Sequence, residues 1–150
     1  MIVGSDVVSQ AAQQLPLPDA MELLKVYLRE HLADQIRIKH LASLVALSPY
    51  YFVRTFTRHV GVPPHRYLLQ MRMERARELL ERSDLSATQI CHRVGFTTLS
   101  HFTNTFRQHV GMSPTAYRRA RMQPGADWRP RQDPATVRQE LASRAGRTFA

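Results

Sequence analysis

The sequence predicts an all-α protein of seven helices, arranged as two similar units joined by a long helix. Three observations support this prediction. Apolar residues from Asp19 to Arg121 recur every three or four positions, the period of one helix face, and no segment shows the alternation of a strand. Serine, proline and glycine mark points where helices begin and end. A block of sequence in the first half also recurs in the second half.

The two ends of the chain are expected to be flexible tails. Residues 1–18 are rich in Gln, Ala, Ser and Pro, and residues 122–150 combine prolines with scattered charges and a basic excess. Such segments bury too little apolar surface to offset the entropy of ordering them. The folded part is therefore expected to span residues 19–121.

Three helices are expected in the first part of this range. The first begins at Asp19, which can act as its N-cap. Its apolar stripe consists of Leu23, Leu24, Tyr27, Leu28 and Leu32. A short second helix surrounds Leu44, and a third starts at Ser48 and Pro49, an N-cap followed by a first-turn proline, and stops at Gly61.

A longer helix and three short ones complete the prediction. Val62-Pro63-Pro64 opens the long helix, which continues to about Arg82. The short helices are expected at about residues 87–94, 98–110 and 114–121.

The chain contains an internal repeat with a shift of fifty residues. Eight of the twenty positions from 48 to 67 are identical to their counterparts fifty residues later. The identical pairs are Phe52/Phe102, Thr55/Thr105, Phe56/Phe106, His59/His109, Val60/Val110, Gly61/Gly111, Pro64/Pro114 and Tyr67/Tyr117. Because only two copies exist, with a long helix between them, two related modules are favoured over a solenoid.

Each copy is predicted to be a helix-turn-helix unit, because a short helix, a tight turn and a second helix with a Phe-x3-Phe core face follow one another. The units are expected at about residues 19–63 and 83–121, with the linker helix at about 64–82. Gly95 fits the left-handed backbone conformation of the second turn. The first turn is one residue shorter and has Ala46 there, where this conformation costs roughly 1 kcal/mol more than for Gly.

Two long segments carry a family resemblance: GFTTLSHFTNTFRQHVGMSPTAYR and SPYYFVRTFTRHVGVPPHRYLLQMRMERARELL. They resemble the C-terminal signature and the first helix-turn-helix with linker helix of the AraC/XylS family, over about residues 19–121. The resemblance implies a DNA-binding domain whose two recognition helices enter successive major grooves on one face of the DNA. Family members usually carry Arg where this chain has Asn104, whereas the first copy keeps Arg54.

The charge of the chain favours an acidic polymer as partner. The formal net charge is +9, and nearly all basic residues are arginines, since Lys25 and Lys39 are the only lysines. From Asp19 to Met122 there are sixteen basic and eight acidic residues, a net of +8, so the excess lies in the part expected to fold. Double-stranded DNA is therefore the expected partner, and RNA polymerase is a further candidate.

The side chains that face DNA in the first unit follow from a helical wheel of about 100° per residue. Relative to Phe52, the core side holds Phe56, His59 and Val60. The opposite side holds Tyr50, Arg54, Thr57 and Arg58. Arg54 is expected to bind guanine O6/N7, Tyr50 to contact a thymine methyl or a phosphate, and Arg58 to hold a phosphate.

The same wheel, drawn about Phe102, selects the DNA-facing residues of the second unit. These are Ser100, His101, Thr103, Asn104, Arg107 and Gln108. The Asn104 amide suits adenine N6/N7, and the shorter side chains can make closer contacts. The alternative for both units is that these side chains belong to merely solvated helix faces.

Catalytic, metal and membrane functions are not favoured by the sequence. The single Cys91 has apolar neighbours that would raise its pKa, which argues against an alkyl-transfer enzyme of the kind sometimes joined to such modules. The seven histidines lack acidic or cysteine partners at ligand spacing, so no metal or cofactor is expected. Without a run of about 20 apolar residues or a secretory signal, we expect a cytoplasmic, nucleoid-associated protein that does not enter the membrane.

Two further alternatives stay open. The chain could be a non-catalytic adaptor or antagonist that binds a regulator or RNA polymerase instead of DNA. It could also be a stand-alone regulator, or a fragment of a larger regulator with an effector-binding domain. In either form a monomer on DNA is expected, because two recognition helices already lie in one chain.

Overall fold

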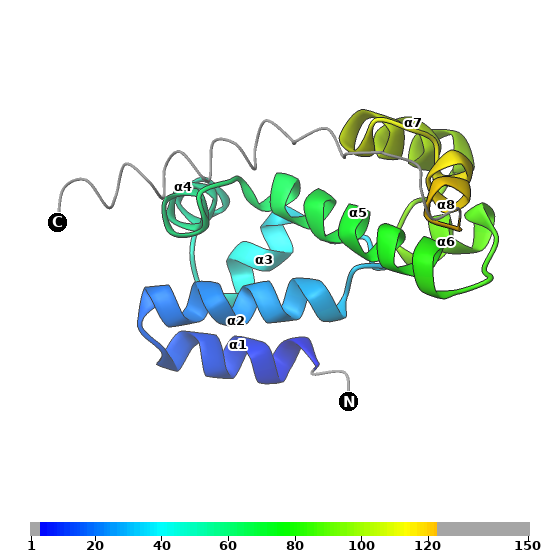
Figure 1. The fold of residues 1–150 in the computed structure, drawn as a ribbon. Helices are drawn as coiled ribbons and strands as arrows, with labels where there is room; N and C mark the ends of the chain where they lie inside the picture. Colours follow the sequence, from blue (N-terminus) through cyan, green and yellow to red (C-terminus); the bar gives the residue numbers. More distant parts are fainter. Residues whose placement is uncertain (1–3, 123–150) are drawn as a thin grey trace, which may run out of the picture. The chain divides into compact units, whose positions relative to one another are not determined.

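The structure is a computed structural model that describes residues 4–122, and within this range it contains helices and no strands. The helices are α1 (Ser5–Gln14), α2 (Leu17–Glu30), α3 (Ile38–Leu44), α4 (Pro49–Val60), α5 (Pro64–Arg82), α6 (Ala87–Arg93), α7 (Leu99–Val110) and α8 (Pro114–Met122) (Figure 1). The all-α prediction is confirmed, with eight helices in this range instead of seven. The expected C-terminal tail lies outside the described residues apart from Met122.

The chain divides into two compact units, Met1–Arg72 and Met73–Ala150. The boundary falls inside α5, the helix predicted as the linker. The first unit contains α1 to α4 with the beginning of α5, and the second contains the end of α5 with α6 to α8. Each unit therefore holds one of the two predicted helix-turn-helix motifs, α3–α4 or α6–α7.

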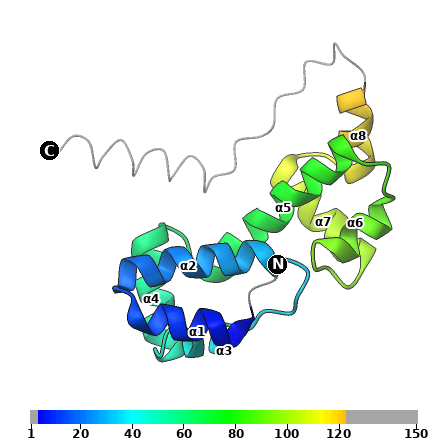
Figure 2. The same ribbon diagram turned by 90° about the horizontal axis from the view of Figure 1, so that it is seen from below.

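The eighth helix is α1, in a segment expected to be a flexible tail. It lies beside α2 and also contacts α3 (Figure 2). Val8 and Ala12, one helical turn apart, are buried in the core of the first unit, and Ser5 Oγ lies 3.3 Å from the Tyr27 hydroxyl. A ten-residue helix is marginal on its own, so α1 depends on these contacts. The expectation of an N-terminal tail is wrong for this helix.

The start of α2 also differs from the sequence prediction. The helix begins at Leu17 after Pro16, so Asp19 lies in the first turn and is not the N-cap. An acidic residue is favourable there because the N-terminus of a helix carries a partial positive charge.

Aromatic rings form the centre of the first unit. The rings of Phe52 and Phe56 are 5.8 Å apart, and Phe56 meets Tyr67 edge-on with 5.7 Å between ring centroids. Both phenylalanines are fully buried. The face of α4 that they occupy is thereby fixed against the rest of the unit, which turns the other face outward.

The second unit repeats this packing. Phe102 and Phe106 are 5.9 Å apart, and Phe106 meets Tyr117 edge-on at 5.6 Å. We call α4 and α7, which carry these phenylalanines, the central helices of the two units. Their ends match as well, since they stop at Gly61 and Gly111, with φ of 93° and 94°. The sequence repeat is therefore a repeat of tertiary structure.

In each unit, one arginine donates hydrogen bonds to backbone carbonyls at or just after the C-terminal end of a helix. In the first unit, Arg72 donates to the carbonyls of Leu32 and Asp34, at 3.0 and 2.9 Å. In the second, Arg118 donates to the carbonyl of Leu80 in the last turn of α5 and to that of Ser83, just after the helix, each at 3.1 Å. These arginines belong to the basic excess of the chain but serve its own structure.

Candidate nucleic-acid interface

The helix before each of α4 and α7 ends in the same way in both units, although the turn that follows is one residue shorter in the first unit. Ala46 has φ of 55° and Gly95 has φ of 91°, so both adopt the left-handed conformation expected from the sequence. The residue after each donates its N–H to the carbonyl five residues earlier, in both cases at 3.0 Å. This is the Schellman arrangement of a helix end. Alanine therefore replaces glycine here without changing the form of the helix end.

Each central helix begins with a side-chain cap. The Ser48 side chain accepts a hydrogen bond from the Tyr51 N–H at 3.3 Å, and the Thr98 side chain accepts one from the His101 N–H at 3.3 Å. Such a cap contributes about 1 kcal/mol to helix stability. The cap also fixes where the exposed first turn of each helix begins.

The outward face of α4 carries Tyr50 and Arg54, both predicted as base readers. Tyr50 is 72% exposed, and Arg54 is also exposed. The Arg54 guanidinium lies over the Tyr50 ring, 5.7 Å from its centroid, with Nη1 3.4 Å from the Tyr50 hydroxyl. These two side chains therefore form a contacting pair on the surface of α4.

The other two predicted residues of α4 differ from each other. Arg58 is exposed, and no carboxylate among residues 4–122 pairs with it. Thr57 is half-buried, and its hydroxyl donates to the Val53 carbonyl at 2.7 Å. The Thr57 proton is thus used within the helix, which leaves its oxygen and methyl group for an external contact.

Tyr51 is an exposed aromatic residue that the wheel analysis did not select. Its side chain is 51% exposed, next to Tyr50 in the first turn of α4. The fifty-residue repeat places Tyr51 opposite His101, which was selected in the second unit. Reading the repeat position by position would have found it.

The outward face of α7 presents five of its six predicted residues as exposed side chains. These are Ser100, His101, Asn104, Arg107 and Gln108. Thr103 is half-buried at the flank. The His101 ring meets the Phe96 ring edge-on, with 5.1 Å between centroids, so it is held against the turn.

Neither central helix contains an acidic residue. The sequences of α4 and α7 are PYYFVRTFTRHV and LSHFTNTFRQHV. Their last turns carry basic residues, which the partial negative charge at a helix C-terminus favours. Both outward faces therefore suit an anionic surface.

His59 lies on the side of α4 that faces α2, next to the core face expected for it. Its side chain is 30% exposed, and its Nε2 lies 3.0 Å from Glu22 Oε1. The repeat partner His109 is half-buried, with Nδ1 3.1 Å from the Thr105 carbonyl. The two histidines thus share a sequence position but not an environment, because the carboxylate in the first unit comes from α2.

The described range contains neither a metal-binding cluster nor a membrane-spanning helix. Residues 4–122 hold no group of three or more His, Cys, Asp or Glu side chains arranged to bind a metal ion. No helix in the same range is long and apolar enough to cross a membrane.

In both units, the second helix of the helix-turn-helix contains no acidic residue and exposes one of its faces. Two such units define a double helix-turn-helix protein. The profile of the helix-turn-helix domain family matches residues 41–120, which is more than half of the chain. The chain belongs to the AraC/XylS family of helix-turn-helix proteins.

Known relatives and solved structures agree with this membership. The regulatory protein PocR of Salmonella typhimurium is 39% identical over 105 residues, which are 69% of this chain and 35% of PocR. The DNA-binding domain of AdpA, solved in complex with a target DNA, is 33% identical with a TM-score of 0.64, over 67% of this chain and 90% of that one. An AraC-type transcriptional regulator from Chromobacterium violaceum is 31% identical with a TM-score of 0.60, over 78% and 97%. The chain spans about a third of the length of PocR.

Proposed function

We propose that this chain is a sequence-specific regulator of bacterial promoters that binds double-stranded DNA with α4 and α7. The observation that carries the proposal is the repeated pairing of a buried Phe-x3-Phe face with an outward, acid-free face in both helices. A recognition helix of this kind enters the major groove with its first turns against base edges. The similar AdpA domain, solved on its target DNA, supports this function.

In the first unit, Arg54 reads a base and Arg58 holds a phosphate. Arg54 is in the second turn of α4 and can bind guanine O6 and N7 with two hydrogen bonds. Arg58 lies one turn later in the helix, where side chains of a recognition helix contact the phosphate backbone of the DNA. Tyr50 and Thr57 complete the contact surface, since both retain accessible groups.

In the second unit, Asn104 reads a base and Arg107 holds a phosphate. The Asn104 amide matches adenine N6 and N7. Ser100, His101 and Thr103 provide shorter contacts around it, and Gln108 completes the contact surface. Because Asn104 is neutral where the first unit has Arg54, the two units read different bases and the first contributes more charge.

The domain division follows the two motifs. The first helix-turn-helix is assigned to about residues 19–63, the linker helix to about 64–82 and the second to about 83–121. The chain is proposed to act as a monomer, with RNA polymerase as a further partner. No catalytic role is proposed, because Cys91 is fully buried and burial raises the pKa of its thiol, which makes the thiolate less available.

Selection of bound duplexes from a random library tests this function. If the two recognition helices lie about one DNA turn apart, we expect a preferred site of roughly 15 to 20 base pairs with two separate regions of preference. The affinity should fall linearly with the logarithm of salt concentration. A footprint confined to half a turn would contradict the two-unit proposal, and absence of salt-dependent duplex binding would favour an adaptor that binds protein instead.

A further inference from the structure

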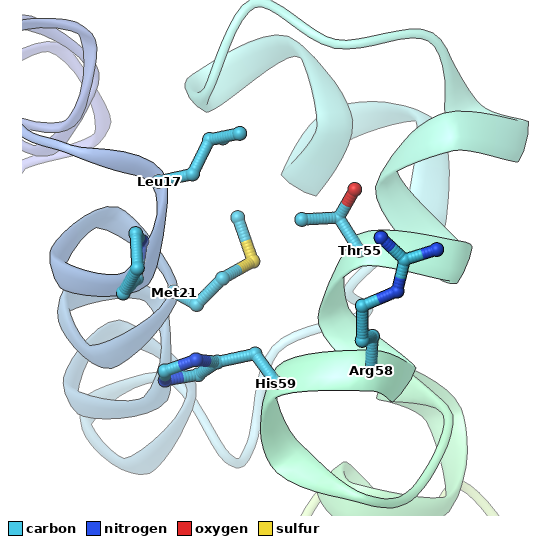
Figure 3. Close-up of a pocket in the computed structure, with 6 residues that line it drawn as sticks. Leu17, Met21, Thr55, Arg58 and His59 are labelled. Carbon is cyan, nitrogen blue, oxygen red and sulfur yellow. The ribbon is translucent and has the colours of Figure 1, made fainter.

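The first unit contains a small pocket between the start of α2 and the second half of α4 (Figure 3). Its volume is ≈ 240 Å³. The lining residues are Leu17, Pro18 and Met21 from α2 and Thr55, Arg58 and His59 from α4. The Met21 thioether and the Thr55 side chain point toward each other across it (Figure 3). The surface of the pocket is thus mostly apolar, and the polar groups of Thr55, Arg58 and His59 border it on the α4 side.

The charges around the pocket favour an anion at its α4 side. Glu22, the neighbouring carboxylate, is engaged by His59 at 3.0 Å and by Lys25 at 3.2 Å. These contacts, the His59 hydrogen bond first, lower the pKa of Glu22 and hold it as a carboxylate. Arg58 has no such partner among residues 4–122. Within the described part of the chain, the positive charge of Arg58 therefore lacks a carboxylate partner beside the apolar walls.

We propose that this pocket binds a small monocarboxylate with a compact apolar body, and that this ligand competes with DNA for Arg58. The carboxylate would accept hydrogen bonds from the Arg58 guanidinium, which can bind both oxygens. The apolar body would lie against Leu17, Pro18 and Met21. Ligand sites usually combine apolar walls with a few placed polar groups, and the volume here suits one ring or a short branched chain.

The competition rests on the proposed function, because Arg58 is assigned there as a phosphate contact. A bidentate bond to a carboxylate in the pocket turns the planar Arg58 guanidinium toward the pocket and takes up the pair of N–H groups that would otherwise bind a DNA phosphate. Binding of the ligand would therefore remove one phosphate contact from the first unit. The expected result is weaker DNA binding with a smaller salt dependence.

The ligand site itself is tested on the free chain, without DNA. We would titrate the full chain, labelled at its methionine methyl groups, with cyclohexanecarboxylate and follow the NMR signal of Met21. A saturable shift is expected for Met21, while Met112 in the second unit stays unchanged. The neutral amide cyclohexanecarboxamide should bind at least about ten-fold more weakly, since it loses the charge-assisted hydrogen bond. No saturable shift, or equal binding of acid and amide, would overturn the proposal.

Two matched variants distinguish a direct contact of Arg58 with the ligand from an effect of the net charge of the protein. Arg58→Gln should weaken cyclohexanecarboxylate binding about ten-fold. Arg29→Gln removes the same charge from an exposed position of α2 outside the pocket, and it should leave the affinity unchanged. Equal effects of the two variants would show that the ligand senses net charge only, which would refute the site.

The competition is measured separately on the selected duplex. Saturating cyclohexanecarboxylate should lower DNA affinity about three- to ten-fold relative to an equal concentration of sodium chloride, and Arg58→Gln should abolish this difference. If the Met21 shift saturates and DNA affinity does not change, the competition is refuted. If the chain binds no DNA, the proposed function fails, and the Met21 titration still decides the ligand site.

Discussion

The guanidinium of Arg54 lies over the ring of Tyr50, one helical turn away, and also within 3.4 Å of its hydroxyl. A free arginine side chain loses considerable rotamer entropy when it is fixed against a base. The Tyr50 ring restricts Arg54 before DNA arrives, through a cation–π contact of about 0.5–1 kcal/mol. Tyr50 is therefore a positioning residue for Arg54 as well as a candidate contact.

Replacing Tyr50 should weaken the preference for the base that Arg54 reads. We expect Tyr50→Ala to lower discrimination at that base about two- to five-fold, and Tyr50→Phe, which keeps the ring, to preserve most of it. Binding of preferred and mismatched duplexes measures this. In a double-mutant cycle, strictly additive effects of Tyr50→Ala and Arg54→Ala would show that the two side chains act independently.

Arg54 and Asn104 occupy equivalent positions in the repeat but should read different bases. Arg54→Ala is expected to relax selection in one half of the site and Asn104→Ala in the other, each by roughly 1 to 3 kcal/mol. Selected-site libraries for the wild type and both variants give the answer. If Asn104→Ala leaves the preferred sequence unchanged in both halves, Asn104 is a solvated residue and the second unit is a phosphate anchor.

Arg58 and Arg107 should contribute affinity without sequence preference. Arg58→Ala or Arg107→Ala is expected to weaken binding to all duplexes alike and to reduce the salt slope by about one unit. Titrations of two unrelated duplexes over a range of salt concentrations would test this. A loss confined to one sequence would instead identify the arginine as a base reader.

Phe56 and Phe106 should each be essential to the stability of their own unit. Both side chains are fully buried between a second phenylalanine and a tyrosine, and truncation of such residues costs roughly 3 to 5 kcal/mol. Thermal or urea unfolding of Phe56→Ala and Phe106→Ala measures the loss. Tyr51→Ala, at an exposed position of α4, is the control and should change stability by less than about 0.5 kcal/mol. Wild-type stability of both phenylalanine variants would mean that the buried faces are assigned incorrectly.

Ala46 and Gly95 offer a test of backbone strain in the two turns. Ala46→Gly should stabilise the first unit by up to about 1 kcal/mol, because φ of 55° is unfavourable for a residue with a Cβ. Gly95→Ala should destabilise the second unit by about 1–2 kcal/mol, since its φ is 91°. Unfolding curves compare them, and a destabilising Ala46→Gly would show that the gain in unfolded-state entropy exceeds the relief of strain.

Much of the fold could be predicted from local patterns in the sequence. Ser48 and Gly61 bound α4 as the capping pattern indicated, because these residues satisfy backbone groups within one turn of themselves. The Phe-x3-Phe spacing predicted which face of α4 and α7 is buried, since a helix has a fixed period. The outward residues followed from the same period, and eight of the ten are exposed.

Three features could be seen only in the tertiary structure, because each depends on contacts between residues far apart in the chain. The segment of α1 has only two buried apolar side chains, Val8 and Ala12, too few to predict a helix, and it is stabilised by packing on α2 and α3. His59 meets α2 because Glu22, 37 residues earlier, lies within hydrogen-bond distance of its ring. The pocket beside Arg58 likewise needs the start of α2 opposite α4. A helical wheel describes one helix at a time, so it cannot contain contacts that exist only when a second helix supplies the other partner.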